Sequence, residues 1–238
     1  MISDETFQFL GIHHIGALIV IILLGSSLIW FEQKSRTYRH KKTWAYLLAW
    51  LNIASLVIAL ISAIITRPDD NWVTWLPLHF CSFMQILCVL SIFTNKAWIR
   101  AACFYGVLTA SLQGLITPDL RAVFPSLRYI DFFMSHGLTV ITAFYLPLAL
   151  QWRPRKYDYL LAQGIGVIYL LFSLIINVFL GTNYGFTMQA PASGSILDYL
   201  GPWPWYILTM QIPIFIVLKL LSLIFIRSKP RLGITFNH

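Results

Sequence analysis

The chain has 238 residues, of which 58% are hydrophobic and only 11% carry a charge, and its mean hydropathy is +0.72. Soluble domains carry about 25% charged residues, so this composition excludes a soluble globular protein and predicts an integral membrane protein. The formal net charge of +8 does not indicate a nucleic-acid-binding protein, because no nucleic-acid-binding motif accompanies it.

Apolar segments long enough to cross a bilayer, about 20 residues each, recur along the chain. Seven segments meet this length: residues 10–31, 44–66, 72–94, 97–117, 128–150, 158–181 and 203–226. We therefore predict an all-α fold, with one membrane domain over residues 1–238 built as a bundle of seven transmembrane helices. Asp4 and Glu5 stand where a signal peptide has a basic region, so the first segment is expected to remain as a span.

Lysine and arginine are divided unevenly between alternating loops, which predicts the orientation of the bundle. Thirteen lie in one set of loops: Lys34, Arg36, Arg39, Lys41, Lys42, Lys96, Arg100, Arg153, Arg155, Lys156, Arg227, Lys229 and Arg231. The opposite set carries Arg67, Arg121 and Arg128. Because basic loops stay in the cytoplasm, we predict an outer N-terminus and a cytoplasmic C-terminus, with anionic inner-leaflet lipids at the basic loops.

Polar residues of six predicted spans share one level, below the outer surface. The set consists of His13, His14, His79, Cys81, Gln113, Asp119, Asp131, Ser135, His136, Ser173, Asn177, Tyr206 and Gln211. Each alone has a structural explanation, such as a hydrogen bond between helices. Their convergence in one leaflet instead predicts a cavity, because ionisable residues inside spans usually face the bundle interior and act in function.

Helix geometry narrows the candidates within the third segment. Cys81 and Gln85 are four residues apart and share a helix face, whereas His79 points elsewhere in a regular helix unless Pro77 distorts this turn. His136, at matching depth in the fifth segment, is therefore the better base for Cys81. The three cysteines, Cys81, Cys88 and Cys103, all lie in apolar segments and do not indicate a disulfide framework.

Several motifs together resemble the YwaF family of bacterial integral membrane proteins. They are "FLGIHHIGAL" (9–18), "WLPLHFCSFMQIL" (75–87), "YGVLTASLQGLITPDL" (105–120), "FPSLRYIDFFMSHGL" (124–138) and "LDYLGPWPWYIL" (197–208). That family is related to eukaryotic transmembrane protein 164, a lipid acyltransferase. The resemblance implies a multi-pass protein of the bacterial plasma membrane that acts on membrane phospholipids, and it implies no cofactor.

The resemblance also suggests site residues. In the eukaryotic pattern a nucleophilic cysteine directly precedes a histidine. The histidine matches His79, but Leu78 occupies the cysteine position, and Cys81 follows three residues later. His136, in "MSHGL", resembles the second histidine of the family.

Our first hypothesis is an intramembrane acyltransferase of the outer leaflet. Cys81 would attack a lipid ester after His136 takes its proton, and Gln85 and Gln113 would stabilise the oxyanion. Asp119 or Asp131 would orient the histidine, and Asn177 and Tyr206 would line the substrate site. In a variant without an acyl-cysteine, a histidine deprotonates the acceptor directly.

Two alternatives remain open at this point. A metal-dependent lipid hydrolase would use His13, His14, His79 and His136 as zinc ligands, although their spacing matches no local zinc motif. A lipid receptor or transporter would need no chemistry, but the sequence has no inverted repeat. The sequence does not name the acyl donor, the acceptor or the oligomeric state, and it does not separate transfer from hydrolysis.

Overall fold

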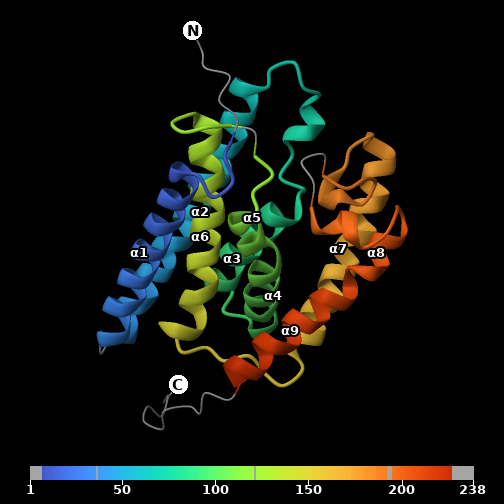
Figure 1. The fold of residues 1–238 in the computed structure, drawn as a ribbon. Helices are drawn as coiled ribbons and strands as arrows, with labels where there is room; N and C mark the ends of the chain where they lie inside the picture. Colours follow the sequence, from blue (N-terminus) through green and yellow to red (C-terminus); the bar gives the residue numbers. More distant parts are fainter. Residues whose placement is uncertain (1–6, 36, 121, 192–194, 227–238) are drawn as a thin grey trace.

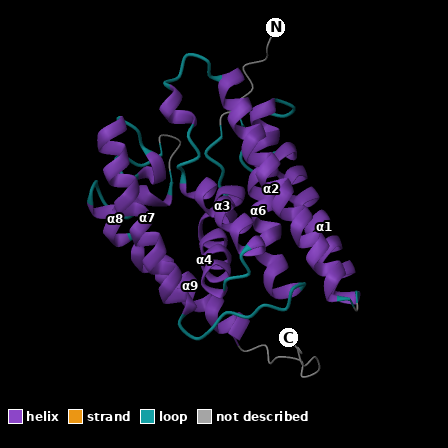
Figure 2. Cartoon of the chain, turned by 180° about the vertical axis from the view of Figure 1, so that it is seen from behind, coloured by secondary structure: helices purple, strands orange, loops and turns teal. Residues whose placement is uncertain are grey.

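The computed structural model describes residues 7–35, 37–120, 122–191 and 195–226, and these residues are arranged as helices and loops (Figures 1 and 2). Five of the described helical units are long and apolar enough to cross a membrane: Ile12–Lys34, Arg39–Thr66, Ala97–Ile116, Asp158–Leu180 and Trp205–Ile226. The prediction of a polytopic helical membrane protein is therefore confirmed at that level.

The other two predicted spans correspond to helices that differ from these five. Helix α3 (Phe80–Phe93) is apolar but has only 14 residues. Helix α6 (Leu127–Leu148) has 22 residues, enough to span a bilayer, but it is more polar because it carries Arg128, Asp131 and His136. Both pack against neighbouring helices of the bundle.

The helices form two groups on either side of a central helical segment (Figure 1). Helices α1 (Ile12–Lys34), α2 (Tyr38–Thr66) and α6 lie together on one side. Helices α7 (Asp158–Leu180), α8 (Trp205–Thr209) and α9 (Gln211–Ile226) lie on the other side. Between them runs one continuous segment, which consists of α4 (Ala97–Gly106), a π-helical turn (Val107–Ser111) and α5 (Leu112–Ile116). Every residue from Ala101 to Leu108 in this segment is buried.

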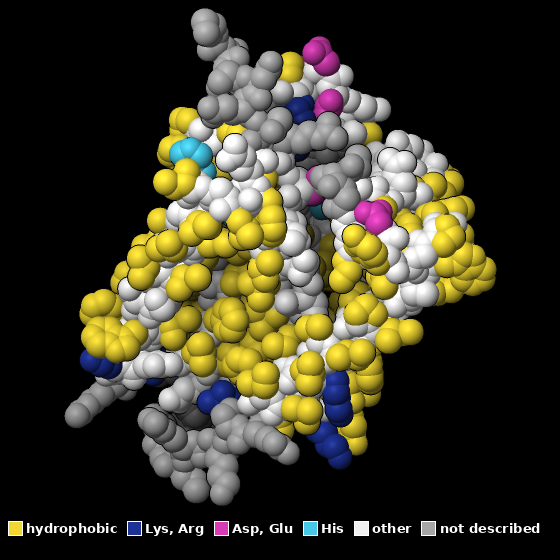
Figure 3. Space-filling view, viewed as in Figure 1, with side chains coloured by type: hydrophobic (Ala, Val, Ile, Leu, Met, Phe, Trp, Pro, Cys, Tyr) yellow, Lys and Arg dark blue, Asp and Glu magenta, His cyan; other side chains and the backbone are white. Residues whose placement is uncertain are grey.

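Apolar side chains also cover the outside of the bundle, as expected for a surface in contact with lipid. Ile12, Ile168 and Phe179 are exposed large hydrophobic residues on α1 and α7. Figure 3 shows lysine and arginine gathered mainly at the lower end of the molecule and acidic residues at the upper end, with a hydrophobic flank between them. We call the upper end, where α1 and α6 begin, the N-terminal end, and we call the opposite end the basic end.

The third predicted segment is interrupted, which is a correction to the expected span 72–94. Trp72–Trp75 forms a short 3-10 helix, the chain then turns, and α3 begins only at Phe80 with His79 as its extended N-cap residue. Pro77 explains the break, because a proline disfavours helical geometry in the residue before it and lacks an N–H group. His79 and Cys81 therefore do not share one regular helix.

The remaining boundaries agree with the predicted segments to within a few residues, except that α2 begins at Tyr38, six residues before the predicted start. The charge asymmetry holds for the basic residues that the structure describes. Those outside the described residues are Arg36, Arg121, Arg227, Lys229 and Arg231. The direction of insertion into the membrane stays a prediction.

Cysteine labelling tests the orientation. In a background without Cys81, Cys88 and Cys103, Asp69→Cys places a thiol at the N-terminal end, and Tyr157→Cys places one at the basic end; both positions are exposed. Because basic loops stay in the cytoplasm, we expect a membrane-impermeant maleimide to label Asp69→Cys in intact cells and Tyr157→Cys only after permeabilisation. The reverse pattern would contradict the predicted orientation.

Candidate functional site

Cys81 lies in the first turn of α3, at the open end of that helix. His79 is the N-cap residue, so Cys81 is the second helical residue, and the first backbone hydrogen bond is donated by Phe83 N to His79 O at 3.0 Å. The N–H groups of Phe80, Cys81 and Ser82 donate to no carbonyl of the described residues. Free N–H groups and the helix dipole both stabilise negative charge at such an end.

Ser111 is the neighbour of the Cys81 thiol. Its hydroxyl faces the thiol from the last position of the π-helical turn. Ser111 Oγ is buried and makes no hydrogen bond of normal geometry with a described residue. π-Helical turns occur frequently at functional sites, because they change the direction in which one side chain points. The result is a polar pair, Cys81 and Ser111, between α3 and the central segment.

His136 is held in the tautomer that a general base requires. Its Nδ1 lies 2.9 Å from the carbonyl oxygen of Phe132, and since a carbonyl only accepts, Nδ1 carries the proton. In the neutral ring Nε2 then has a lone pair, and it makes no hydrogen bond with another described residue. The ring stacks on Phe132 at 4.2 Å between centroids and lies against Gly114, where an added Cβ would be 3.1 Å from Nε2.

Cys81 and His136 thus contact the same short segment, Cys81 at Ser111 and His136 at Gly114. Ser111 and Gly114 are three residues apart, a spacing that separates Cβ positions on one helix face by about 5–6 Å. Cys81 and His136 make no direct hydrogen bond in the described part of the chain.

His79 lies near this pair but faces a different side. It is exposed, its ring packs edge-on against Tyr184 at 5.2 Å, and it lies within electrostatic range of Arg67 and Asp119. The backbone before it is fixed by two tyrosines. Tyr169 on α7 donates a hydrogen bond to Leu78 O at 2.8 Å, and Tyr184 donates one to Val73 O.

The two glutamines proposed as oxyanion donors have protein partners. Gln85 is buried and donates from Nε2 to Asn52 O at 3.2 Å and to Ser55 Oγ at 3.3 Å, which joins α3 to α2. Gln113 is exposed and donates to Thr117 Oγ1 at 2.7 Å. Their roles at the site stay predictions, whereas the backbone N–H groups of α3 are unoccupied donors beside Cys81.

Asn177 and Tyr206 organise the loop that follows α7. Asn177 donates to Tyr184 O at 2.9 Å and to Thr187 Oγ1 at 2.8 Å, and its Oδ1 accepts from Tyr184 N at 2.8 Å. Tyr206 donates to Phe186 O from α8. These bonds place Tyr184 against His79, so both residues shape the site through this loop.

Asp119 and Asp131 line a pocket next to these residues. It has a volume of about 150 Å³ and lies at the N-terminal end between α2, α6 and residues 119–120. Its lining includes Phe132, whose ring stacks on His136, so the pocket and the Cys81–His136 site share a wall. None of the predicted catalytic residues lines it.

The four histidines named as zinc ligands do not converge. His14 is buried, with Nε2 2.9 Å from Leu115 O and Nδ1 accepting from Leu10 N, so both nitrogens join α1 to its neighbours. His13 is exposed and stacks on Phe124. No group of three or more His, Cys, Asp or Glu side chains suited to a metal ion occurs within the described ranges.

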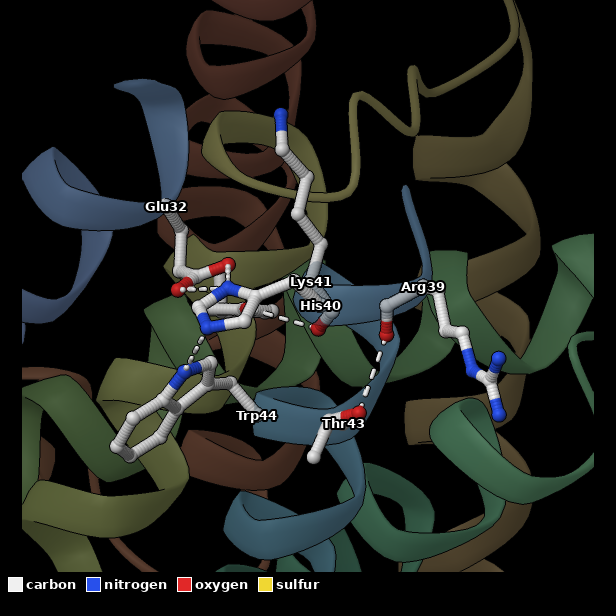
Figure 4. Close-up of polar contacts among 7 residues, drawn as sticks. Glu32, Arg39, His40, Lys41, Thr43 and Trp44 are labelled. Atoms are coloured by element: carbon white, nitrogen blue, oxygen red, sulfur yellow. Dashed lines mark hydrogen bonds and ion pairs between the residues drawn. The ribbon is translucent and has the colours of Figure 1, made fainter. Parts of the chain in front are cut away.

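A polar cluster at the basic end was not expected from the sequence (Figure 4). The Glu32 carboxylate, 1% exposed, lies 3.0 Å from His40 Nδ1, and Trp44 Nε1 donates to His40 Nε2 at 3.4 Å. Both ring nitrogens of His40 are therefore occupied. The cluster connects α1 to α2 and leaves no lone pair for proton transfer.

Ser111 and Gly114 are the site residues that sequence analysis missed. Both lie in the quoted stretch "YGVLTASLQGLITPDL", and their spacing of three residues was the available signal. The π-helical turn and the packing of His136 onto Gly114 are visible only in the structure.

Comparison with known proteins gives one match. A family model described as the TMEM164 family matches residues 9–222. Comparisons with curated proteins and with solved structures found no match.

The loop role of Asn177 makes a stability prediction. Asn177→Ala removes these hydrogen bonds and leaves buried partners unsatisfied, which costs about 2 kcal/mol. We expect the thermal midpoint of the purified protein in detergent to fall by about 5 °C. Gln113→Ala is the matched control, since it removes one exposed hydrogen bond. Equal midpoints for the two variants would contradict the assigned role of Asn177.

Proposed function

Because the chain belongs to the TMEM164 family over residues 9–222, we propose that it is a membrane-embedded acyltransferase that moves an acyl chain between phospholipids. The resemblance of the sequence motifs to the related YwaF family of bacterial membrane proteins supports a bacterial plasma-membrane enzyme of this kind. The observation that carries the proposal is the position of Cys81 in the open first turn of α3, with the unoccupied Nε2 of His136 on the same face of the central segment.

The proposed reaction has two halves that use the same residues. His136 Nε2 takes the proton of Cys81, and the thiolate attacks the ester carbonyl of a donor lipid. The free N–H groups of α3 stabilise the oxyanion, and the leaving alkoxide takes the proton back from His136. A hydroxyl or amine of the acceptor then gives its proton to His136 and attacks the acyl-cysteine, which regenerates the thiol.

Ser111 supports the thiol in this scheme, and His79 is placed to contact the acceptor. The Ser111 hydroxyl has no other partner, so it is available to donate to the thiolate. His79 is exposed beside the pocket and is the second candidate base. If water replaces the acceptor, the same residues perform hydrolysis, so the products decide between the two reactions.

The direct test uses purified protein in vesicles of defined phospholipids with an added lysophospholipid, followed by lipid mass spectrometry. We expect new diacyl species whose acyl chain comes from the donor. Release of free fatty acid alone would indicate a hydrolase, and unchanged lipids across donor classes would favour a non-enzymatic receptor or transporter.

Replacement of Cys81 separates a covalent from a direct mechanism. Cys81→Ser loses easy ionisation, so we expect activity to fall by about 10³-fold or more, as for removal of a nucleophile. Wild-type protein should also carry a hydroxylamine-labile acyl group. Cys103→Ser, in the buried α4, is the control and should stay within a few-fold of wild type. Full activity of Cys81→Ser without a trapped acyl group would leave His136 and His79 as the bases.

The packing of His136 on Gly114 makes an independent prediction. In Gly114→Ala the added Cβ lies 3.0 Å from His136 Cδ2 and 3.1 Å from Nε2, so the ring must move. Because small displacements of a catalytic group are costly, we expect a loss of about tenfold or more in turnover with an unchanged thermal midpoint. Gly164→Ala on α7 is the matched control, since its Cβ meets nothing within 4 Å. Equal activity of the two variants would remove His136 from the mechanism.

A further inference from the structure

The pocket at the N-terminal end contains two of the few basic residues at that end of the bundle. Its lining residues are Ala59, Ser62, Ala63, Thr66, Arg67, Asp119, Leu120, Arg128, Asp131 and Phe132. Arg67 follows the last residue of α2, and Arg128 is the second residue of α6. Two elements distant in sequence thus bring two guanidinium groups to one pocket.

Some polar atoms of this pocket make no hydrogen bond of normal geometry with the residues that the structure describes. Arg67 Nε is buried and makes no hydrogen bond of normal geometry with a described residue, although another nitrogen of Arg67 pairs with Asp70. Ser62 Oγ also lacks a hydrogen bond of normal geometry, but its hydroxyl faces the Asp131 carboxylate. Ser62 itself is fully buried. Arg128 is half-buried and forms no hydrogen bond or close ion pair with another residue that the structure describes, although Asp131 and Asp119 lie within electrostatic range. Buried polar groups normally have partners, so these point to a ligand.

We expect the pocket to lie at the depth of lipid headgroups. The apolar span of α2 ends at Thr66, directly before Arg67. Trp72 is exposed in the short helix that follows α2, and tryptophan is enriched at the membrane–water interface. We propose that this pocket binds the phosphate of a phospholipid headgroup through Arg67 and Arg128. Guanidinium groups suit this ligand because they donate paired hydrogen bonds to phosphate oxygens.

The carboxylates of the pocket favour a lipid over free phosphate. Asp119 and Asp131 offset the two arginines, so the pocket is close to neutral, and Asp70 pairs with Arg67 at 3.5 Å on its rim. A phosphodiester carries one negative charge, whereas a phosphate monoester or inorganic phosphate carries about 1.5 to 2 at pH 7. Repulsion by the carboxylates therefore acts more strongly on the free ion.

The location relates this site to the proposed function, on which its role as a substrate subsite rests. Phe132 lines the pocket and stacks on His136, and His79 lies within electrostatic range of Arg67 and Asp119. A headgroup held here places its lipid beside the Cys81–His136 site. Binding itself does not require that chemistry, so the two are tested separately.

The test measures binding of a short-chain phosphatidylcholine to the full-length protein in detergent, with a diacylglycerol of the same chains as the headgroup-free probe. The Cys81→Ser variant is used as the parent, so that turnover does not consume the probe. We expect the phospholipid to bind more tightly than the diacylglycerol. Arg128→Gln should weaken the phospholipid about ten- to a hundred-fold and leave diacylglycerol binding unchanged. Arg128→Lys keeps the charge but loses the paired donors, so its affinity for the phospholipid should lie between that of the parent and that of Arg128→Gln.

Arg153→Gln, at the exposed basic end, is the matched control and should bind like the parent. Unchanged phospholipid binding in both Arg128→Gln and Arg67→Gln, with thermal midpoints equal to that of the parent, would overturn the proposal. Displacement of the lipid by an equal concentration of inorganic phosphate would overturn the lipid assignment in favour of a free-anion site. Loss of catalysis in every assay with intact binding would refute the proposed function alone.

Discussion

Pro77 sets the position at which α3 begins, and the geometry of the candidate site depends on that position. A continuous helix from Trp72 would pair the N–H groups of Phe80, Cys81 and Ser82 with preceding carbonyls. The break at Pro77 delays the helix to Phe80, so these groups remain free within the bundle rather than at its surface. A helix end inside a membrane protein costs free energy unless the unpaired groups find partners. The unpaired N–H groups are confined to the start of α3, which indicates that this position holds the negative charge of a ligand.

The interrupted segment needs support from outside, and α7 with its following loop supplies it. Tyr169 bonds to Leu78 O, and Tyr184 bonds to Val73 O, on the two sides of Pro77. Asn177 fixes Tyr184 by accepting from its N–H and donating to its carbonyl. The polar residues near the end of α7 thus act on the site indirectly, through Tyr184 and the backbone on either side of Pro77. Their place at the same depth as Cys81 follows from this support and does not require contact with substrate.

The sequence predicted the arrangement of spans well, because burial in lipid demands long apolar stretches and basic loops mark their ends. It could not predict the neighbours of Cys81. The expected partner residues were assigned on regular helices, but α3 starts late and the central segment contains a π-helical turn that shifts the register of Ser111 and Gly114. Gln85 illustrates the same limit, since its depth was predicted while its bonds to Asn52 and Ser55 depend on how α2 packs. The depth of a residue in the membrane follows from the hydropathy pattern, whereas the neighbours that its side chain faces follow from tertiary packing.

The polar groups at the two ends of the bundle differ in whether they have hydrogen-bond partners. At the basic end, Glu32 is buried but both nitrogens of its partner His40 are occupied, so the cluster is closed and joins helices. At the N-terminal end, the N–H groups of α3, His136 Nε2 and Arg67 Nε make no hydrogen bond with the described residues. Unsatisfied polar groups are expensive in lipid, and a bundle that tolerates several of them around one location gains nothing in stability from doing so. Their concentration between α2, α3, α5 and α6 is therefore the strongest reason to seek the chemistry of this protein at that end.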